Sequence, residues 1–344
     1  MRKIFSIELL RVICTITVCV DHIAITAIHI HESTSSNVDR FVYYGIQHWS
    51  HFAVPIFLMI SGFLLLNPQK KIGYEKVIKK YIKRLVIVLL TIGTFYAFLE
   101  ALFETHEISF QNIGNAFLCV FEDKGWDHMW YLYMIIGIYL VLPIFKSAYN
   151  GISSKIFSNF LVVMFLFTSI MPIISSYTGF NCGIKFPIMS IFLFYFLLGK
   201  WAFDTGNKLR FNSITLYALT MIMMLIPIVL AYLEFFKDLP SLELLINYDS
   251  PLMVAISVLT VWSVMKVKEG KSKHLTYIVA HLGKNSFGIY VFHMFWINLI
   301  YKFFHYNPIE HNALYFMLLV ILVLVLSDIT TILFKKIPYI GSSI

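Results

Sequence analysis

The stretch RVICTITVCVDH, residues 11–22, lies inside an apolar run at 6–29 and places an arginine, an aspartate and a histidine within that run. An apolar run of roughly 20 residues can cross the ~30 Å hydrocarbon layer of a membrane as a helix. We therefore predict that this run is a transmembrane helix. Its charged side chains need an explanation, because each costs about 2.5–3.5 kcal/mol to insert.

The composition of the whole chain indicates the same class of protein. Of its 344 residues, 59% are hydrophobic and 13% are charged, whereas a water-soluble domain carries about 25% charged residues. Since no polar stretch is long enough to fold separately, we expect one all-α integral membrane domain, a helix bundle over residues 1–344. Hydropathy predicts about ten membrane spans, at 6–29, 47–66, 84–104, 128–148, 155–176, 187–206, 213–235, 250–267, 285–305 and 312–334.

Basic residues predict the orientation of these spans. If the N-terminus is cytoplasmic, 21 of the 27 Lys and Arg fall on the cytoplasmic side, and Arg11 lies within the first span. The five on the other side are Arg40, Lys124, Lys185, Lys237 and Lys302. Because Lys and Arg accumulate in cytoplasmic loops, both termini are predicted to be cytoplasmic and the first span to be an uncleaved signal anchor. The net charge of +8 then reflects topology, and nucleic-acid binding is not expected.

Two connecting segments have amphipathic or basic character. The segment 105–127 mixes apolar and polar residues and is predicted to form an interfacial helix on the outer side. The segment 67–84 is basic and partly helical in pattern, and it is predicted to lie along the cytoplasmic surface.

The four cysteines do not predict a metal site, because none of them forms a CxxC pair. Cys14 and Cys19 are expected to pack inside the bundle. A disulfide between Cys119 and Cys182, both expected on the outer side, is the less favoured alternative.

The ionisable residues of the first span follow the geometry of a helix. Glu8 and Arg11 are three residues apart, so their side chains can pair on one face. Arg11 and His22 are eleven apart, which returns within ~20° of the same face at an axial distance of ~16 Å. Asp21 points about 100° away from His22, so a simple Asp–His dyad is not expected. These charges either hold the bundle together or serve chemistry, and histidine is the side chain best suited to proton transfer near neutral pH.

Further motifs follow the first span in order along the chain. VPIFLMISGFLLL (54–66) ends in Ser-Gly-Phe and three leucines, and KKYIKRL (79–85) is a basic segment containing Arg84. HMWYLYMIIGIYLVLPIF (128–145) contains Tyr-x-x-x-Pro, and FLFYFLLGKW (192–201) contains a phenylalanine-rich segment ending in glycine. NSFGIYVFHMF (285–295) has the form Ser-x-x-x-Tyr-x-x-His.

Together these motifs resemble the acyltransferase-3 family of membrane proteins, which typically transfer acyl groups to cell-surface glycans. The resemblance begins with Glu8, Arg11 and His22 and covers most of the chain. KKYIKRL is similar to an Arg-hydrophobic-x-Arg-hydrophobic-x-Pro element, but Tyr81 replaces the first arginine and Ile87 the proline.

The resemblance implies an O-acyltransferase with acetyl-CoA as co-substrate and no metal. The catalytic candidates are His22 as general base, Arg11 and Glu8. The candidates for holding the phosphates of CoA at the cytoplasmic mouth are Arg11, Arg84, Lys80 and Lys83. The candidates for contact with the acceptor are His128, Trp130, Ser286, Tyr290 and His293. His48 and His51 are further candidates to line an acceptor vestibule, and Asp328 is expected to be structural.

The implied reaction moves an acetyl group, with succinyl as the next candidate, to a hydroxyl of a cell-surface polysaccharide or lipid-linked glycan. Direct transfer is our hypothesis, and an acyl-histidine intermediate is the variant. The protein is expected to be multi-pass in the inner or plasma membrane of a bacterium. The sequence leaves open whether the chain forms a homo-oligomer.

A transporter or flippase for a lipid-linked or small polar substrate is the alternative function. Ten spans with buried charges fit it as well. Paired broken helices in two halves of the chain would favour it, and the sequence does not show that symmetry. A regulatory membrane subunit would leave Arg11 and His22 unexplained.

Overall fold

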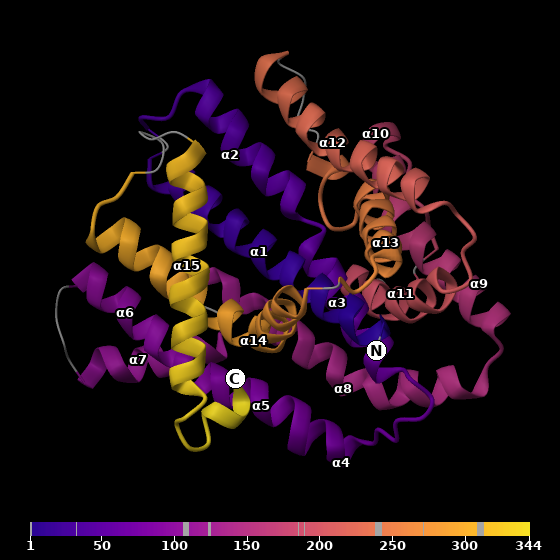
Figure 1. Cartoon of the computed structure of the whole chain (residues 1–344), viewed down its shortest axis with the longest axis horizontal. Coiled ribbons are helices and arrows are strands. Elements are labelled where there is room, and N and C mark those ends of the chain that lie inside the picture. The colour runs from indigo at the N-terminus through magenta and orange to yellow at the C-terminus, as the bar shows by residue number, and fades with distance from the viewer. Residues whose placement is uncertain are drawn as a thin grey trace.

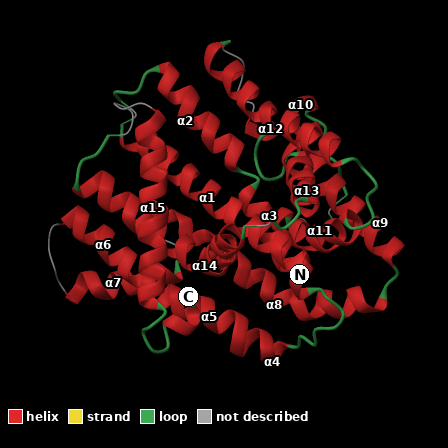
Figure 2. Ribbon diagram, viewed as in Figure 1, coloured by secondary structure: helices red, strands yellow, loops and turns green. Residues whose placement is uncertain are grey.

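The chain folds into long helices that pack side by side (Figure 1). The structure, a computed structural model, describes residues 2–31, 33–105, 110–122, 125–184, 186–188, 190–237, 243–270, 272–307 and 313–344. Across these ranges the helices are joined by loops and turns, and no strand occurs (Figure 2). The predicted all-α fold is confirmed.

The helices have the following bounds. The α-helices are α1 (Arg2–Ile30), α2 (Asn37–Ser50), α3 (Ala53–Leu65), α4 (Tyr74–Lys76), α5 (Lys83–Val88), α6 (Thr94–Thr105), α7 (Phe110–Phe121), α8 (Trp130–Gly151), α9 (Ser154–Phe165), α10 (Met171–Thr178), α11 (Ile191–Gly206), α12 (Ser213–Phe236), α13 (Pro251–Lys266), α14 (Lys273–Asn298) and α15 (Ala313–Phe334). Segments of π-helix continue some of them, namely η1 (Val77–Ile82), η2 (Leu89–Gly93), η4 (Leu166–Ile170) and η6 (Leu299–Phe303). Short 3₁₀ turns are η3 (Asp127–Met129), η5 (Glu243–Leu245) and η8 (Gly341–Ser343).

Seven helices of the described chain are long and apolar enough to cross a membrane. They span Phe5–Ile30, Asn37–Leu65, Tyr74–Phe103, Asp127–Gly151, Ser154–Thr178, Ser213–Phe236 and Ala313–Phe334. The other three predicted spans correspond to α11, α13 and the second half of α14 with η6. Both α11 and α13 have 16 residues, and α14 carries polar residues along its length. The chain is therefore a multi-pass membrane protein.

The segment 67–84, predicted to be partly helical, is helical in its second half. From Tyr74 the chain is already helical, and it continues without a break as α4, η1, α5, η2 and α6. Val77 and Leu85 are buried in the core, whereas the lysines between them, including Lys80, are exposed. One face of this helix packs against the bundle, so packing extends the helix beyond the apolar run that hydropathy detects.

The second span also begins earlier than predicted. A capping box at Ser36 and Asp39 starts α2 ten residues before the predicted boundary at 47. A turn at His51 and Phe52 then separates α2 from α3. Because α2 packs against α1 and α12, residues such as Tyr43 in its first turns are buried.

Glycines allow two pairs of helices to approach closely. A Cβ on Gly62 of α3 would lie 1.6 Å from the carbonyl oxygen of Phe196, and one on Gly199 of α11 would lie 2.0 Å from that of Met59. A Cβ on Gly283 of α14 would lie 2.2 Å from Oε2 of Glu8 on α1. The contacts of α3 with α11 and of α1 with α14 therefore depend on glycine at these positions.

A polar cluster joins α14 to α15. Nε2 of His281 lies 2.8 Å from Oδ2 of Asp328, and Asn285 donates to Oδ1 of Asp328 at 2.6 Å. Lys335 donates in turn to the side-chain oxygen of Asn285 at 2.5 Å. Asp328, which was expected to be structural, thus contacts His281 and Asn285, and these contacts join α14 to α15.

The cysteines of the described chain are all free. Cys14 and Cys19 are buried, as expected, whereas Cys119 and Cys182 are partly exposed and form no disulfide. The helix α7 lies within the segment 105–127, for which an interfacial helix was predicted. Residues 106–109, 123 and 124 of that segment lie outside the described residues, as does Lys185.

Candidate active site

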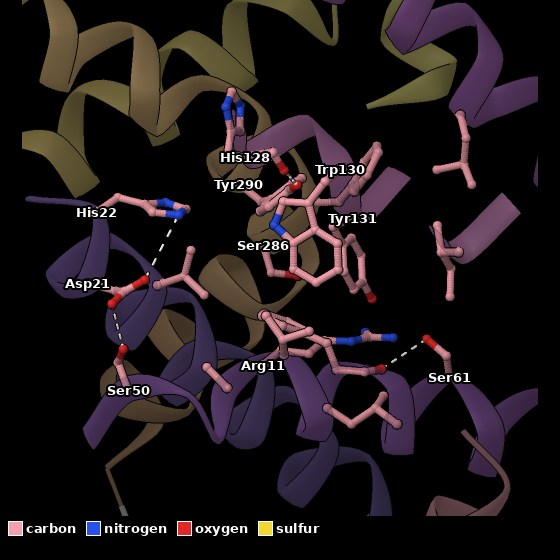
Figure 3. A pocket seen from close by; sticks show the side chains of 18 of the residues that line it. Arg11, Asp21, His22, Ser50, Ser61, His128, Trp130, Tyr131, Ser286 and Tyr290 are labelled. Atoms are coloured by element: carbon pink, nitrogen blue, oxygen red, sulfur yellow. Dashed lines mark hydrogen bonds and ion pairs between the residues drawn. The ribbon is translucent and has the colours of Figure 1, made fainter. Parts of the chain in front are cut away.

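A cavity of about 300 Å³ lies inside the bundle, between α1, α3, α5, α8 and α14. Arg11 and His22 both line it, although eleven residues of α1 separate them. In Figure 3, His128 lies above the centre of the view and Arg11 below it, and Ser286, Trp130 and Tyr131 lie between them. We call the part lined by Arg11, Arg84 and Lys284 the basic end, and the part lined by Asp21, His22, Ser50 and His128 the histidine end.

Glu8 and Arg11 form the ion pair that their spacing predicts. Nη1 of Arg11 lies 2.9 Å from Oε1 of Glu8, on successive turns of α1. The other carboxylate oxygen of Glu8 is buried without a hydrogen-bond partner, and Gly283 of α14 packs against it. Glu8 therefore fixes the direction of the guanidinium of Arg11, which is 28% exposed.

Arg84 lines the cavity with two of its nitrogens already engaged. Nε donates to the carbonyl oxygen of Ser343 and Nη2 to that of Ile344, both at 2.7 Å. The guanidinium also lies 4.5 Å from the ring centre of Phe287 on α14. These contacts hold Arg84 close enough to Arg11 for the two charges to interact.

The two other residues predicted to hold the phosphates do not lie at the basic end of the cavity. Lys80 and Lys83 are exposed and do not line the cavity. Lys284, on the first half of α14, lines it instead. The sequence analysis did not select Lys284, although it immediately precedes the NSFGIYVFHMF motif.

His22 makes a short hydrogen bond to His293. Nδ1 of His22 lies 2.6 Å from Nε2 of His293, and the two rings face each other edge to edge, with their planes 17° apart and their centres 4.9 Å apart. His293 is completely buried and does not line the cavity. The structure thus places His293 behind His22, and not at the cavity surface where an acceptor would contact it.

Asp21 lies beside the other ring nitrogen of His22. Oδ2 of Asp21 is 3.9 Å from Nε2 of His22, which is longer than a hydrogen bond. Oδ1 of Asp21 accepts a hydrogen bond from Ser50 at 2.7 Å. The two residues form no Asp–His dyad, and Figure 3 shows Ser50 holding Asp21 at the side of the cavity.

His128 brings a third imidazole to the histidine end. Its ring centre lies 6.4 Å from that of His22 and 5.4 Å from that of His293. The residue is 2% exposed, and the polar group that interacts with its ring is the backbone carbonyl of Val291. The nearby carbonyl of Val291 accepts from Tyr96 at 2.9 Å.

The three imidazoles are not arranged as a metal site. Nδ1 of His22 and Nε2 of His293 lie at hydrogen-bonding distance from each other, so they cannot both point at a shared ion. Across the described residues, no group of three or more His, Cys, Asp or Glu has a metal-binding arrangement. A hydrogen bond and ring contacts join the three imidazoles.

The remaining predicted acceptor residues line the cavity between its two ends. Ser286, Tyr290 and Trp130 all face it, and the hydroxyl of Tyr290 donates to the backbone carbonyl of His128. Trp130 lies against the ring of Tyr248, with ring centres 6.1 Å apart. His51 lines the cavity, and its Nδ1 lies 3.0 Å from the carbonyl oxygen of Ile246.

Of the two histidines expected at the vestibule, His48 is not part of the lining. Sequence reasoning also missed several lining residues, among them Ser50, Tyr131, Tyr139 and Tyr248. Tyr131 and Tyr139 belong to the segment that was quoted for its Trp and its Tyr-x-x-x-Pro. Their spacing was the available signal, because Tyr131 and Tyr139 each lie four residues from Ile135 and so share one face of the helix.

Comparison with known proteins assigns the chain to a class. A family model described as an acyltransferase domain, that of the acyltransferase-3 family, matches residues 4–332. The match covers nearly the whole chain, so this protein belongs to the acyltransferase-3 family. No curated protein and no solved structure matches the chain.

Proposed function

We propose that the protein moves an acetyl group from acetyl-CoA to a hydroxyl of a cell-surface polysaccharide or lipid-linked glycan. The observation that carries this proposal is the single cavity lined by Arg11 at one end and by His22 at the other. Membership of an acyltransferase family supports the reaction type, and the cavity supports a path on which donor and acceptor meet.

The basic end suits the donor. Arg11, Arg84 and Lys284 line it, and guanidinium and ammonium groups bind phosphates through charge-assisted hydrogen bonds. In this proposal they hold the phosphates of acetyl-CoA, and the thin pantetheine arm extends through the cavity. An arm of this kind covers the ~16 Å by which the helix geometry separates Arg11 from His22.

His22 is the general base in this scheme. Its free ring nitrogen takes the proton of the acceptor hydroxyl while that oxygen attacks the carbonyl carbon of the thioester. The tetrahedral intermediate collapses by breaking the carbon–sulfur bond, and the proton on His22 passes to the leaving sulfur. The products are the acetyl ester and CoA with a free thiol, so atoms and charge balance.

Direct transfer is preferred to an acyl-histidine intermediate. Nδ1 of His22 is held by His293 at 2.6 Å, which leaves only Nε2 for chemistry. An acetyl group on Nε2 would leave no nitrogen of this ring to take the proton of the acceptor hydroxyl. The test is incubation with radiolabelled acetyl-CoA in the absence of acceptor. Label retained on the protein after denaturation would replace direct transfer with the two-step route.

We propose ten membrane crossings with both termini in the cytoplasm of a bacterium. In that orientation the basic end faces the cytoplasm, where acetyl-CoA is made, and the histidine end faces the outer side. The distribution of Lys and Arg along the chain supports this orientation.

The deciding assay uses purified protein in lipid, acetyl-CoA, and polysaccharide extracted from cells that lack the protein. We expect acceptor-dependent release of CoA thiol, with the new ester detected by mass spectrometry of the polysaccharide. His22→Ala should lower the rate about 10²–10⁴-fold, as expected for loss of a general base. His29→Ala is the matched control, because His29 lies on the same helix and is exposed.

The same assay separates the enzyme from a transporter. Movement of a lipid-linked glycan across the membrane that persists in His22→Ala, without any release of CoA, would favour transport. Release of CoA that requires acceptor and His22 supports acyl transfer.

A further inference from the structure

His293 has a fixed pattern of protons. Its Nδ1 lies 2.6 Å from the backbone carbonyl oxygen of Tyr290, one turn earlier on α14. A carbonyl oxygen only accepts hydrogen bonds. The proton of the neutral ring must therefore lie on Nδ1, which leaves a lone pair on Nε2.

The surroundings of His293 favour the neutral ring. The side chain is 0% exposed, and the imidazoles of His22 and His128, which are bases as well, lie with their ring centres 4.9 and 5.4 Å away. The phenol of Tyr290, 5.8 Å away, is uncharged at neutral pH. An imidazolium buried without a counter-charge is strongly disfavoured. Nε2 of His293 is thus a hydrogen-bond acceptor.

The proton pattern of His22 follows from that of His293. Nδ1 of His22 lies 2.6 Å from this acceptor and must donate to it. A neutral His22 then carries its proton on Nδ1 and a lone pair on Nε2. Nε2 is the nitrogen on the side of Asp21, and both residues line the cavity.

We infer that His293 is a positioning residue that holds His22 in the Nδ1–H tautomer, so that Nε2 of His22 faces the cavity as the proton acceptor. This inference rests on the proposed function for its consequence in turnover, but not for its geometry. With the opposite tautomer, the cavity would meet an N–H group, which cannot take a proton from a hydroxyl.

Neighbouring contacts keep His293 in place. The hydroxyl of Tyr96 donates to the carbonyl of Val291 at 2.9 Å, and the hydroxyl of Tyr290 donates to the carbonyl of His128. These bonds fix the α14 turn that supplies both the carbonyl of Tyr290 and the ring of His293. When His22 gains a proton on Nε2, Asp21 at 3.9 Å stabilises the resulting charge.

The first test reads the tautomer directly. Protein labelled with ¹⁵N in its histidine rings is placed in lipid nanodiscs without ligand, and the His22 signals are assigned by their loss in His22→Gln. We expect wild-type His22 to be neutral with its proton on Nδ1. In His293→Leu, which cannot accept a hydrogen bond, this preference should be lost, and in His293→Gln, whose amide oxygen can accept, it should be kept.

The second test measures turnover with acetyl-CoA and the polysaccharide acceptor. His293→Leu should lower kcat about 10²-fold without changing KM for acetyl-CoA, and His293→Gln should recover activity to within about tenfold of wild type. A structural defect alone would not be repaired selectively by a side chain that restores one acceptor atom.

Each result has a defined meaning. A wild-type His22 with its proton on Nε2, or an unchanged His22 tautomer in His293→Leu, overturns the inference. Failure of His293→Gln to recover activity while it keeps the tautomer also overturns it. If wild-type protein shows the Nδ1–H tautomer but no acyl transfer, the proposed function fails while the assigned role of His293 in fixing the tautomer stands.

Discussion

His128 is a buried ring next to the proposed base, and the backbone carbonyl of Val291 interacts with one of its nitrogens. A single carbonyl engages one ring nitrogen, and leaving the other unpaired costs about 1–3 kcal/mol, so we expect a reacting oxygen to supply the second partner. We predict that His128→Phe lowers kcat about 10²-fold, as for loss of one donor to a developing oxyanion. The same variant should melt at an unchanged or higher temperature.

Tyr290→Phe provides the contrast for His128→Phe. The hydroxyl of Tyr290 donates to the backbone carbonyl of His128, so its removal leaves a buried acceptor unpaired and should lower the melting temperature. Both temperatures are measured on detergent-solubilised protein. If His128→Phe lowers the melting temperature as Tyr290→Phe does, its ring is a structural group and the prediction is wrong.

Arg11 is predicted to hold a phosphate of the donor. Arg11→Ala should raise KM for acetyl-CoA about 10–100-fold, the loss expected for a charge-assisted hydrogen bond of about 1.5–3 kcal/mol. With S-acetylpantetheine, which lacks the nucleotide and its phosphates, the variant and wild type should have similar kcat/KM. Steady-state CoA or pantetheine release measures both substrates.

Lys80→Ala is the control for Arg11→Ala. Lys80 is a basic residue that was also predicted to hold the phosphates, but it is exposed and does not line the cavity. Its KM for acetyl-CoA should change by less than about twofold, as for most surface substitutions. If Arg11→Ala lowered kcat/KM equally with acetyl-CoA and with S-acetylpantetheine, Arg11 would not bind the phosphates.

At the residue scale, local geometry decides what the sequence can predict. The pair of Glu8 and Arg11 is confirmed because three residues of one helix determine it. The bond between His22 and His293 joins residues 271 positions apart. It depends on how α1 packs against α14, which no local pattern specifies. Likewise, Lys80 and Lys284 are equally basic in the sequence, and only packing brings Lys284 to the cavity.

At the scale of helices, Gly62 and Gly199 set the contact between α3 and α11. We predict that Gly62→Ala and Gly199→Ala each destabilise the protein by about 1–3 kcal/mol, because each new Cβ meets a backbone carbonyl and must push the helices apart. The double variant should lose less stability than the sum of the two single variants, because the first added methyl group already separates α3 from α11. Thermal or denaturant unfolding in detergent measures all three.

Gly137 of α8 supplies the matched control. A Cβ at this position meets nothing within 4 Å, so Gly137→Ala should leave the melting temperature unchanged or slightly higher. Additive losses in the double variant of Gly62 and Gly199 would show that the two glycines act at independent contacts.

The same packing explains which helices the sequence places correctly. The first span was predicted within a residue or two, because its apolar run and its helix nearly coincide. The helix that begins at Tyr74 starts ten residues before the predicted span at 84, because lysines on its exposed face hide the buried face formed by Val77 and Leu85. The mean hydropathy of a window of residues detects a segment that is apolar on all sides, but it does not detect a helix with a single apolar face.

At the scale of the whole molecule, the number of crossings depends on the short helices. With 16 residues each, α11 and α13 extend only ~24 Å, less than the ~30 Å hydrocarbon layer. However, α11 contacts α3, α9 and α13 and is largely buried. Non-helical backbone at membrane depth is tolerated where protein surrounds it, so a short, enclosed helix can complete a crossing. We therefore favour ten crossings over seven.

Single cysteines distinguish the two topologies. In a chain with Cys119 and Cys182 replaced by serine, Lys208→Cys and Lys336→Cys should react with a membrane-impermeant maleimide only after the cells are permeabilised, whereas Lys237→Cys should react in intact cells. If α11, α13 and α14 did not cross, all three results would reverse, because Lys208 follows α11 and the other two follow an altered number of crossings.

Two positions calibrate this labelling because both topologies place them alike. Thr34→Cys, between the first two spans, should react in intact cells, and Lys80→Cys should react only after permeabilisation. The ten-crossing arrangement puts the basic end of the cavity on the side of Lys80 and the histidine end on the side of Thr34, since α1 runs from one to the other. Reaction of Lys80→Cys from outside would invert the molecule and separate the basic end from cytoplasmic acetyl-CoA, so the same experiment tests the route of the donor.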